Sequence, residues 1–298
     1  MRKLSYPGRS NVLAQNGMVA TSNPLSSMVA INVLQKGGNA VDAAIAASAV
    51  QAVVCPSATG IGGDCFAIIS MNGKKPIAVN GSGIAPKKAN LQFYKDNKIK
   101  NIGLTSPHSV TIPGAVHAWC SMHEKFGRID FKEVLSGAEN FARKGFPVHE
   151  VEAIAWKENE KKLKKNPNSK KLFLNKNLSY SYGEVFKNIP LANTLRVISK
   201  NKIKGFYQSE ITKDMVKTLN KLGGLHTEED FYNQKTLFSK TITNSYRNLK
   251  IHQCPLNSPG LVVLMMMAMT EKLNIKKYHP SSYERYHLQA EISKICFE

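Results

Sequence analysis

The sequence predicts a mixed fold of helices and strands, built as a single domain over residues 1–298. Stretches of helical length, either alanine-rich or amphipathic, alternate with short apolar runs bounded by Gly, Asn or Pro. Of the 298 residues, 42% are hydrophobic, which is enough to bury a large core. The chain shows neither an internal repeat nor a linker that would divide it.

Two helices are predicted near the N-terminus, and a short strand at residues 16–22 precedes them. Pro24 suits the first position of the first helix, and Gly37 follows its end. Asn39 then caps a second, alanine-rich helix. Asp42 lies three residues on, where a carboxylate complements the free amides of a helix N-terminus.

The remaining elements follow from the same turn signals and periodicities. In chain order they are strands at 66–70 and 75–83 joined by a turn at Asn72-Gly73, a strand and a helix within 108–127, a helix at 131–144, a Lys-rich helical stretch over 151–209, a helix at 210–222, a strand at 241–254, and a Met-rich helix after the turn at 256–260.

The formal net charge of +20 has two interpretations. A focused basic patch would attract nucleic acid or an anionic substrate. The alternative is a Lys- and Asn-rich composition spread over the surface. The densest cluster, Lys157 to Lys171, is interleaved with Glu, Asn and Pro, which is typical of a solvated helix face. No nucleic-acid-binding module accompanies the charge, so we predict no nucleic-acid partner.

The cysteine and histidine patterns predict neither a disulfide framework nor a metal site. Five cysteines are an odd number without a CxxC pair, and the eight histidines form no HxxxH or HxH pair. Cys65 could be a nucleophile, but a small buried thiol is the favoured interpretation. We therefore expect no metal and no cofactor, and a reducing, cytoplasmic location. The N-terminus has no signal peptide and no segment suits a membrane span, so no membrane association is expected.

The segment "CPSATGIGGDCF" (residues 55–66) is a glycine-rich loop between a helix and a strand. A phosphate-binding P-loop would need Lys and Ser or Thr, and a dinucleotide fingerprint would need the order strand, glycines, helix. Neither condition is met. The loop therefore indicates only a backbone that comes close to a ligand or to a neighbouring segment.

An ordered series of motifs carries a family resemblance. The series is "GMVATSNPLSS", "VLQKGGNAVDAAIAASAVQAVVCPSATGIGGDCFAII", "VTIPGAVHAW", "EKFGR", "GFPV", "GFYQSEITKDMVKTLNKLGGLHTEEDF" and "YRNLKIHQCPLNSPG". Together these motifs resemble the large, N-terminal subunit of the gamma-glutamyltransferase family. The resemblance extends from about Gly17 to the last residue.

The resemblance implies an N-terminal-nucleophile hydrolase of the α+β class, with helices outside two stacked sheets in a four-layer αββα sandwich. Such proteins cleave themselves in front of a Thr, whose amine and hydroxyl then act as base and nucleophile. The sandwich is expected to be incomplete here because the small-subunit region is absent. No Thr of this chain has the nucleophile's context, including Thr241 and Thr243. We therefore assign no catalytic residue within the chain.

Two functions from different classes follow from the resemblance. The chain is part of a gamma-glutamyltransferase-like acyltransferase or amidohydrolase that needs a small catalytic subunit, or it is a non-catalytic remnant or partner-binding fragment. In either case we expect the chain alone to be inactive. Uncovered strand edges are also expected to make it associate or aggregate.

The resemblance also points to substrate-binding residues. Family members that process glutathione carry an Arg that pairs with the α-carboxylate of the substrate, whereas "NGSGIAP" places Ser82 there. This form resembles an intracellular branch of the family, for which a gamma-glutamyl or similar acyl amide is the expected substrate. Asn80, Ser82 and Gly83 are predicted to line the pocket, the alternative being a simple strand-end turn. His108 is either a replacement cation or, as we favour, a surface or strand-end residue.

Overall fold

The computed structural model describes residues 11–298, which divide into two compact units. The first unit comprises residues 11–60 and 126–200, and the second comprises residues 61–125 and 201–298. Each unit is therefore built from two separate segments of the chain. The single domain expected over residues 1–298 stays a prediction. The prediction about a signal peptide concerns residues 1–10, which lie outside the described residues.

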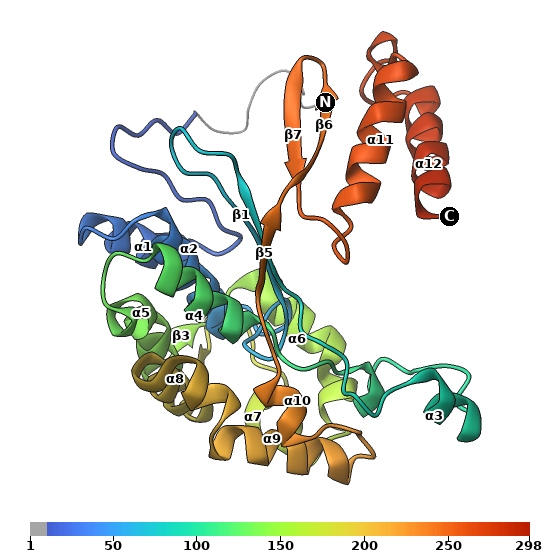
Figure 1. Ribbon diagram of the computed structural model, residues 1–298. Coiled ribbons are helices and arrows are strands. Elements are labelled where there is room, and N and C mark those ends of the chain that lie inside the picture. The colour runs from blue at the N-terminus through green and yellow to red at the C-terminus, as the bar shows by residue number, and fades with distance from the viewer. Residues whose placement is uncertain (1–10) are drawn as a thin grey trace. The chain divides into compact units, whose positions relative to one another are not determined.

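Three helices form the centre of the first unit (Figure 1). Helix α2 (Ala40–Val54) packs against both α1 (Pro24–Gln35) and α5 (Phe131–Lys144). Its alanines are buried and let the neighbouring helices approach closely. The predicted capping of α2 by Asn39 and Asp42 is present as a capping box. The Asn39 side chain accepts the backbone N–H of Asp42, and the Asp42 carboxylate accepts the backbone N–H of Asn39.

The rest of the first unit is arranged around a cluster of aromatic rings. Trp156 lies 4.9 Å from Phe186 and 5.2 Å from Tyr180, measured between ring centroids. Strand β3 (Phe146–Pro147) pairs antiparallel with β4 (Val185–Phe186) in this part of the unit. The helices here are α6 (Glu150–Leu163), α7 (Pro167–Phe173) and α8 (Ile189–Tyr207), of which α8 belongs to the first unit only up to residue 200.

A three-stranded antiparallel sheet forms the frame of the second unit. Its strand order is β1-β2-β5, with β1 (Cys65–Ile69), β2 (Ile77–Gly81) and β5 (Leu237–Lys240). The predicted turn between β1 and β2 is confirmed, and Gly73 has a φ of +71° there. Helix α4 (Ala115–Phe126) runs close to β2, since a Cβ added to Gly81 would lie 2.5 Å from Ala118 Cβ.

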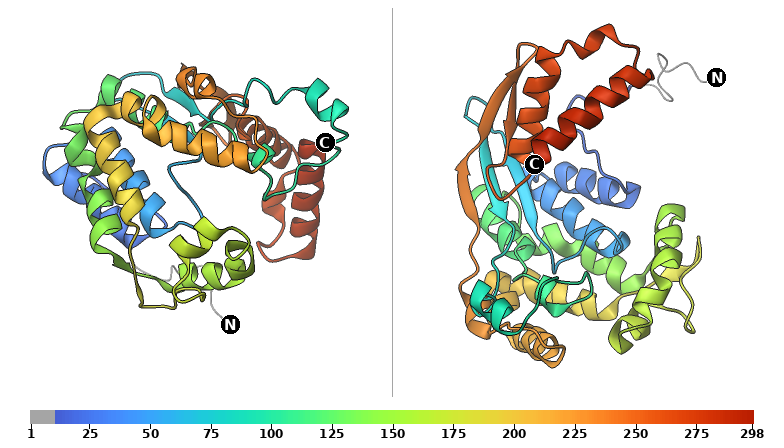
Figure 2. Two further views of the ribbon diagram at one scale, coloured as in Figure 1. Left: turned by 90° about the horizontal axis from the view of Figure 1, so that it is seen from below. Right: turned by 90° about the vertical axis from the view of Figure 1, so that its right-hand side faces the viewer.

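The strand predicted over 241–254 is a hairpin in the structure. Strands β6 (Ile242–Tyr246) and β7 (Leu249–Gln253) pair antiparallel, and Arg247 and Asn248 turn the chain with φ values of +49° and +65°. Figure 2 shows helices α11 (Gly260–Lys272) and α12 (Tyr283–Phe297) side by side. The other elements of this unit are α3 (Leu91–Asp96), η1 (Pro107–Ser109), α9 (Glu210–Lys221), α10 (Glu228–Tyr232) and η2 (Ile275–Lys277).

Two other strand predictions are wrong. Residues 16–22 pair with no strand in the described part of the chain, and residues 107–109 form a 3-10 helix that begins at Pro107. An apolar extended run becomes a strand only where a neighbouring strand accepts its hydrogen bonds. None of the helices within residues 11–298 combines the length and the apolarity that crossing a membrane requires.

Candidate functional site

Asn80 and Ser82 lie at the end of the central strand of the second unit. Asn80 is paired with Phe66 of β1 and with Leu237 of β5, so its backbone is held from both sides. The Asn80 Oδ1 accepts the backbone N–H of Ser82 at 3.0 Å, which turns the chain out of the strand. The half-buried Asn80 side chain is thereby fixed in one orientation.

A third residue, Asn257, joins these two from the turn in front of α11. The Asn80 Nδ2 donates to Asn257 Oδ1 at 2.9 Å. The Ser82 Oγ lies 3.3 Å from Asn257 Oδ1 and 3.2 Å from its Nδ2. Residues 80, 82 and 257 thus form one hydrogen-bonded group, which we call the amide cluster.

The turn that carries Asn257 is itself well held. The Ser258 Oγ donates to the Cys254 carbonyl at 2.7 Å and accepts the Gly260 N–H at 3.2 Å. The prediction that this segment is a turn in front of a helix is confirmed, because α11 begins at Gly260. Sequence reasoning missed Asn257 as a member of the site. A polar residue in a Pro- and Gly-rich turn was the only available signal, and nothing in its spacing links it to residue 80.

Gly83 has a clear backbone role. Its φ is +80°, and a Cβ added to it would lie 1.9 Å from the Ile112 carbonyl oxygen. The Ile112 N–H donates to the Ile84 carbonyl at 2.8 Å, so two backbone segments meet at this point. A part of Gly83 in lining a substrate pocket stays a prediction.

The amide cluster is electrically neutral. Two carboxamides and one hydroxyl can donate and accept hydrogen bonds, but they provide no charge and no nucleophile. Within residues 11–298, none of the hydrogen bonds of the cluster involves a Lys or Arg side chain. The arrangement suits a carbonyl, amide or hydroxyl group and lacks the two-pronged cation that a carboxylate prefers.

His108 lies in a different environment. Its ring packs on Phe93 and Tyr94 at centroid distances of 5.9 and 5.5 Å. The ring and hydrogen-bond contacts described for His108 do not reach the amide cluster. His108 is half-buried in the 3-10 helix η1, so it is neither an exposed surface residue nor the end of a strand. A part of His108 in substrate binding stays a prediction.

The glycine-rich loop contributes to helix capping. The Gly63 carbonyl accepts the N–H groups of Gly114 at 2.9 Å and Ala115 at 3.0 Å, where α4 begins. Gly60 and Gly62 have open space around an added Cβ, so close packing does not explain these two glycines. Burial raises the pKa of the Cys65 thiol to about 11, which keeps it protonated and favours the non-nucleophilic interpretation.

Thr241 is an internal residue with a structural contact. Its Oγ1 lies 2.8 Å from Nδ1 of His252 across the β6–β7 hairpin. An N-terminal nucleophile needs a free amine on the same residue, and the backbone nitrogen of an internal Thr is an amide. The structure therefore offers no reason to assign catalysis to this residue.

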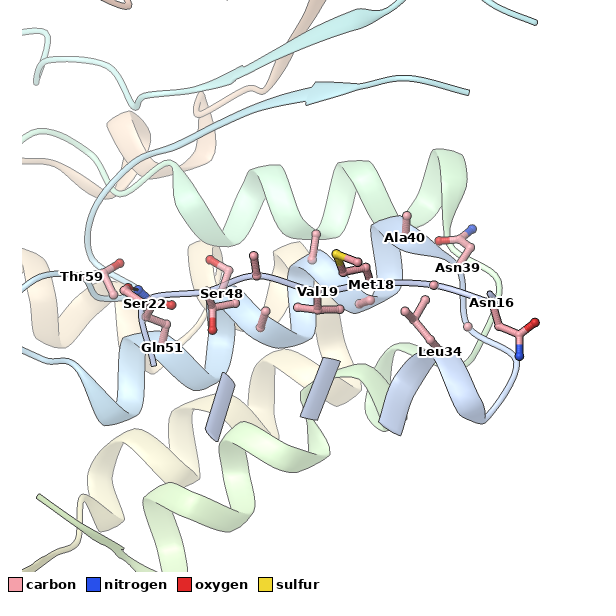
Figure 3. A pocket seen from close by; sticks show the side chains of 17 residues that line it. Asn16, Met18, Val19, Ser22, Leu34, Asn39, Ala40, Ser48, Gln51 and Thr59 are labelled. Carbon is pink, nitrogen blue, oxygen red and sulfur yellow. Dashed lines mark hydrogen bonds between the residues drawn. The ribbon is translucent and has the colours of Figure 1, made fainter. Parts of the chain in front are cut away.

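A groove of about 830 Å³ lies in the first unit, between residues 16–22 and α2 (Figure 3). Ala, Ser, Asn, Gly, Thr and a few apolar side chains line it, and none of the lining residues is titratable at neutral pH. Acid–base chemistry therefore cannot come from the groove itself.

Comparison with known proteins identifies the family. A family model described as gamma-glutamyltranspeptidase matches residues 26–298. The glutathione hydrolase-like YwrD proenzyme of Bacillus subtilis is 31% identical over 289 residues, and a glutathione hydrolase proenzyme of a Pseudomonas species (strain A14) is 32% identical over 284 residues. These alignments cover 96% and 93% of this chain, but 55% and 49% of the two relatives. The chain thus spans about half the length of the curated relatives that it matches.

Solved structures show the same relationship in three dimensions. The gamma-glutamyltranspeptidase of Helicobacter pylori superimposes with a TM-score of 0.89 at 28% identity, covering 97% of this chain and 84% of that chain. A cephalosporin acylase from Bacillus halodurans gives 0.89 at 31% identity, covering 99% and 56%. The predicted α+β class, with the N-terminal-nucleophile hydrolase fold, is confirmed. The chain therefore belongs to the gamma-glutamyltranspeptidase family.

Proposed function

We propose that this chain is the large-subunit part of an enzyme that cleaves an acyl amide and transfers the acyl group to water or to an amine. The Thr nucleophile comes from a small catalytic subunit. The support is the match to the family over residues 26–298 and the likeness to a glutathione hydrolase-like proenzyme and a cephalosporin acylase. Both of these relatives are named for reactions at amide bonds.

The observation that carries the substrate proposal is the neutral amide cluster. Ser82 occupies the position where the resemblance to glutathione-processing enzymes places an Arg, and it is hydrogen-bonded to Asn257. Without a guanidinium, the cluster does not select a substrate for its α-carboxylate. We therefore propose a gamma-glutamyl or similar acyl donor, such as a glutaryl amide, bound through uncharged groups.

The small-subunit partner is supported by features of the first unit. Residues 16–22 are without a paired strand in the described chain, and they border the uncharged groove along α2 (Figure 3). Val12, Leu13 and Met18, which lie in or just before this segment, expose 59%, 90% and 55% of their surfaces. Exposed apolar side chains beside an unpaired extended segment suit an added polypeptide. The cytoplasm is the compartment we propose, since all five cysteines are unpaired.

The experiment compares two chromogenic amides. The chain is co-expressed with the small-subunit half of a relative such as the Bacillus subtilis YwrD proenzyme, and the complex is assayed on gamma-glutamyl-p-nitroanilide and glutaryl-p-nitroanilide. Replacing Ser82 by Arg supplies the missing guanidinium, and S82K supplies the same charge without the two-pronged geometry.

We expect S82R to raise kcat/KM for the gamma-glutamyl amide relative to the glutaryl amide by about 10- to 100-fold, from a charged hydrogen-bonded pair of about 1.5–3 kcal/mol. S82K should give a smaller change. An unaltered ratio in S82R would remove the substrate proposal. A complex that assembles but cleaves neither amide would favour the non-catalytic alternative.

A further inference from the structure

Three potential metal ligands converge in the first unit, whereas the amide cluster belongs to the second. They are Cys55 at the C-terminal cap of α2, His149 at the N-terminal cap of α6, and Glu152 in the first turn of α6. The Cys55 Sγ lies 3.6 Å from Nε2 of His149, although the two residues are 94 positions apart in the sequence. One ligand atom from each of the three residues lies within 4.8 Å of the others.

The carboxylate of this group is buried without a cation. Glu152 exposes 3% of its surface and accepts the Ser57 N–H at 2.9 Å and the Ser57 hydroxyl at 2.8 Å. Within residues 11–298, no Lys, Arg or His forms an ion pair with it. Burying a carboxylate is costly unless a positive charge or several donors compensate. Two donors from one serine supply part of this compensation.

We propose that Cys55, His149 and Glu152 bind a divalent zinc ion that ties the end of α2 to the start of α6. Thiolate, imidazole and carboxylate are the three ligand types that zinc takes in proteins. A thiolate and a carboxylate carry two negative charges, so the occupied site is neutral. That neutrality suits a location where Cys55 is only 5% exposed.

The geometry of the first two ligands already suits zinc. In a tetrahedral site, a sulfur at about 2.3 Å and a nitrogen at about 2.0–2.1 Å from zinc are about 3.5–3.6 Å apart. The Cys55–His149 separation is 3.6 Å. Glu152 is the ligand that must move, by turning its carboxylate from Ser57 toward the other two. A solvent molecule would complete the fourth position, and His149 is only half-buried.

The proton balance of binding is simple. The Cys55 thiol releases one proton to solvent as its sulfur binds the ion. The His149 Nδ1 accepts the Glu152 N–H at 3.4 Å, so Nε2 carries the ring proton in the unoccupied protein. On binding, that proton moves to Nδ1, and the weak cap contact is lost. No redox change and no further reactant are involved.

The sequence pattern predicts no metal site, because the usual signature of such a site is a set of ligands close together in the sequence. His149 and Glu152 have the spacing of a helix turn, but the third ligand comes from the glycine-rich loop. Only the packing of α6 near the end of α2 brings the three together. We therefore base the proposed metal site on the three side chains that lie together in space, and not on their spacing in the sequence.

The test uses the full chain without an affinity tag, stripped with a chelator and titrated with Co²⁺, a spectroscopic substitute for zinc. We expect one Co²⁺ per chain, with a thiolate-to-cobalt charge-transfer band and intense visible bands of tetrahedral coordination. Zinc should displace the cobalt and raise the midpoint of thermal unfolding, since it binds the folded state.

Four variants separate a built site from chance binding at a thiol. C55S should lose the charge-transfer band. H149S and E152Q should weaken Co²⁺ binding about tenfold or more. Ser is a better helix N-cap than His, so H149S keeps the start of α6 and should fold like the parent by circular dichroism. C65S changes a half-buried cysteine outside the cluster and should bind like the parent.

The proposal is overturned if the parent chain shows no charge-transfer band. It is also overturned if C65S loses the band as C55S does, or if H149S and E152Q bind Co²⁺ with the affinity of the parent. Either of those last two results would mean that a thiol alone, without the assembled site, captures the metal.

Discussion

Gly83 allows a sharp test of how the end of β2 is built. Its φ of +80° disfavours any residue with a Cβ, and the added atom would lie 1.9 Å from the Ile112 carbonyl oxygen. G83A therefore combines a conformational cost with a collision against backbone. Gly73, in the β1–β2 turn of the same unit, has a φ of +71° with open space around the added Cβ. G73A carries the first cost only.

The two costs can be estimated separately. A left-handed conformation costs a residue with a Cβ about 1–2 kcal/mol. Relieving the contact at Gly83 requires moving Ile112, which breaks its 2.8 Å hydrogen bond to Ile84 at a cost of about 0.5–1.5 kcal/mol, with lost packing in addition. We therefore expect G73A to lower the unfolding free energy by about 1–2 kcal/mol and G83A by about 2–4 kcal/mol.

Urea unfolding followed by tryptophan fluorescence measures the difference. The chain has two tryptophans, and the 2% exposed Trp119 lies in α4 of the second unit. A W156F background removes the signal of the first unit from all samples. Equal destabilisation by G83A and G73A would refute the argument that the Ile112 carbonyl excludes a side chain at position 83.

Three further predictions concern buried polar groups. Y207F should lower the unfolding free energy by about 1–3 kcal/mol in urea titrations, because the Tyr207 hydroxyl donates to the Pro113 carbonyl at 2.7 Å and accepts the His117 N–H at 2.9 Å. Burial lowers the pKa of both His117 and His226 from about 6.5, so the folded state resists protonating them. The contribution of the two neutral histidines to the unfolding free energy is complete above pH 6.5 and is lost as the pH falls through their lowered folded-state pKa. An H117Q/H226Q variant should therefore lose less stability than the parent between about pH 7 and 5. D42A should cost about 1–3 kcal/mol by thermal or urea unfolding, because the fully buried Asp42 carboxylate accepts the Asn39 N–H at 2.9 Å and the Arg128 N–H at 3.0 Å. An unchanged unfolding midpoint in Y207F or D42A would contradict its argument, as would an H117Q/H226Q variant that loses as much stability between about pH 7 and 5 as the parent does.

The helices near the N-terminus were predictable because their signals are local. Asn39 and Asp42 accept the hydrogen bonds of the first backbone amides of α2 from within the same turn. Pro24 suits the start of α1 because it has no backbone N–H that would be left unpaired there. Such signals depend on three or four neighbouring residues. A single sequence contains them in full, so the bounds of α1 and α2 agree with the prediction.

The strands were less predictable because pairing is a long-range property. Residues 16–22 have a strand-like sequence but no paired partner within the described chain. The β6–β7 hairpin was missed for a different reason. Its turn uses Arg247 and Asn248 at positive φ instead of the Asn-Gly or Gly-Gly pair that marks such turns.

The candidate sites show the same limit. Asn80 and Ser82 were selected from their motif, and their part in substrate binding stays a prediction. Asn257, 175 residues from Ser82 in sequence, is brought to them by the packing of the turn before α11. Glu152 has the sequence pattern of an ordinary first-turn acid in a Lys-rich helix. Only the folded first unit shows its carboxylate beside Cys55.

The central claim is that this chain takes part in acyl transfer only together with a Thr-bearing small subunit. The most direct measurement is the steady-state release of p-nitroaniline from gamma-glutamyl- and glutaryl-p-nitroanilide by the purified chain alone and by its co-purified complex with a small subunit. We predict no turnover by the chain alone and sustained turnover of at least one amide by the complex. Sustained turnover by the chain alone, or none by an assembled complex, would contradict the account.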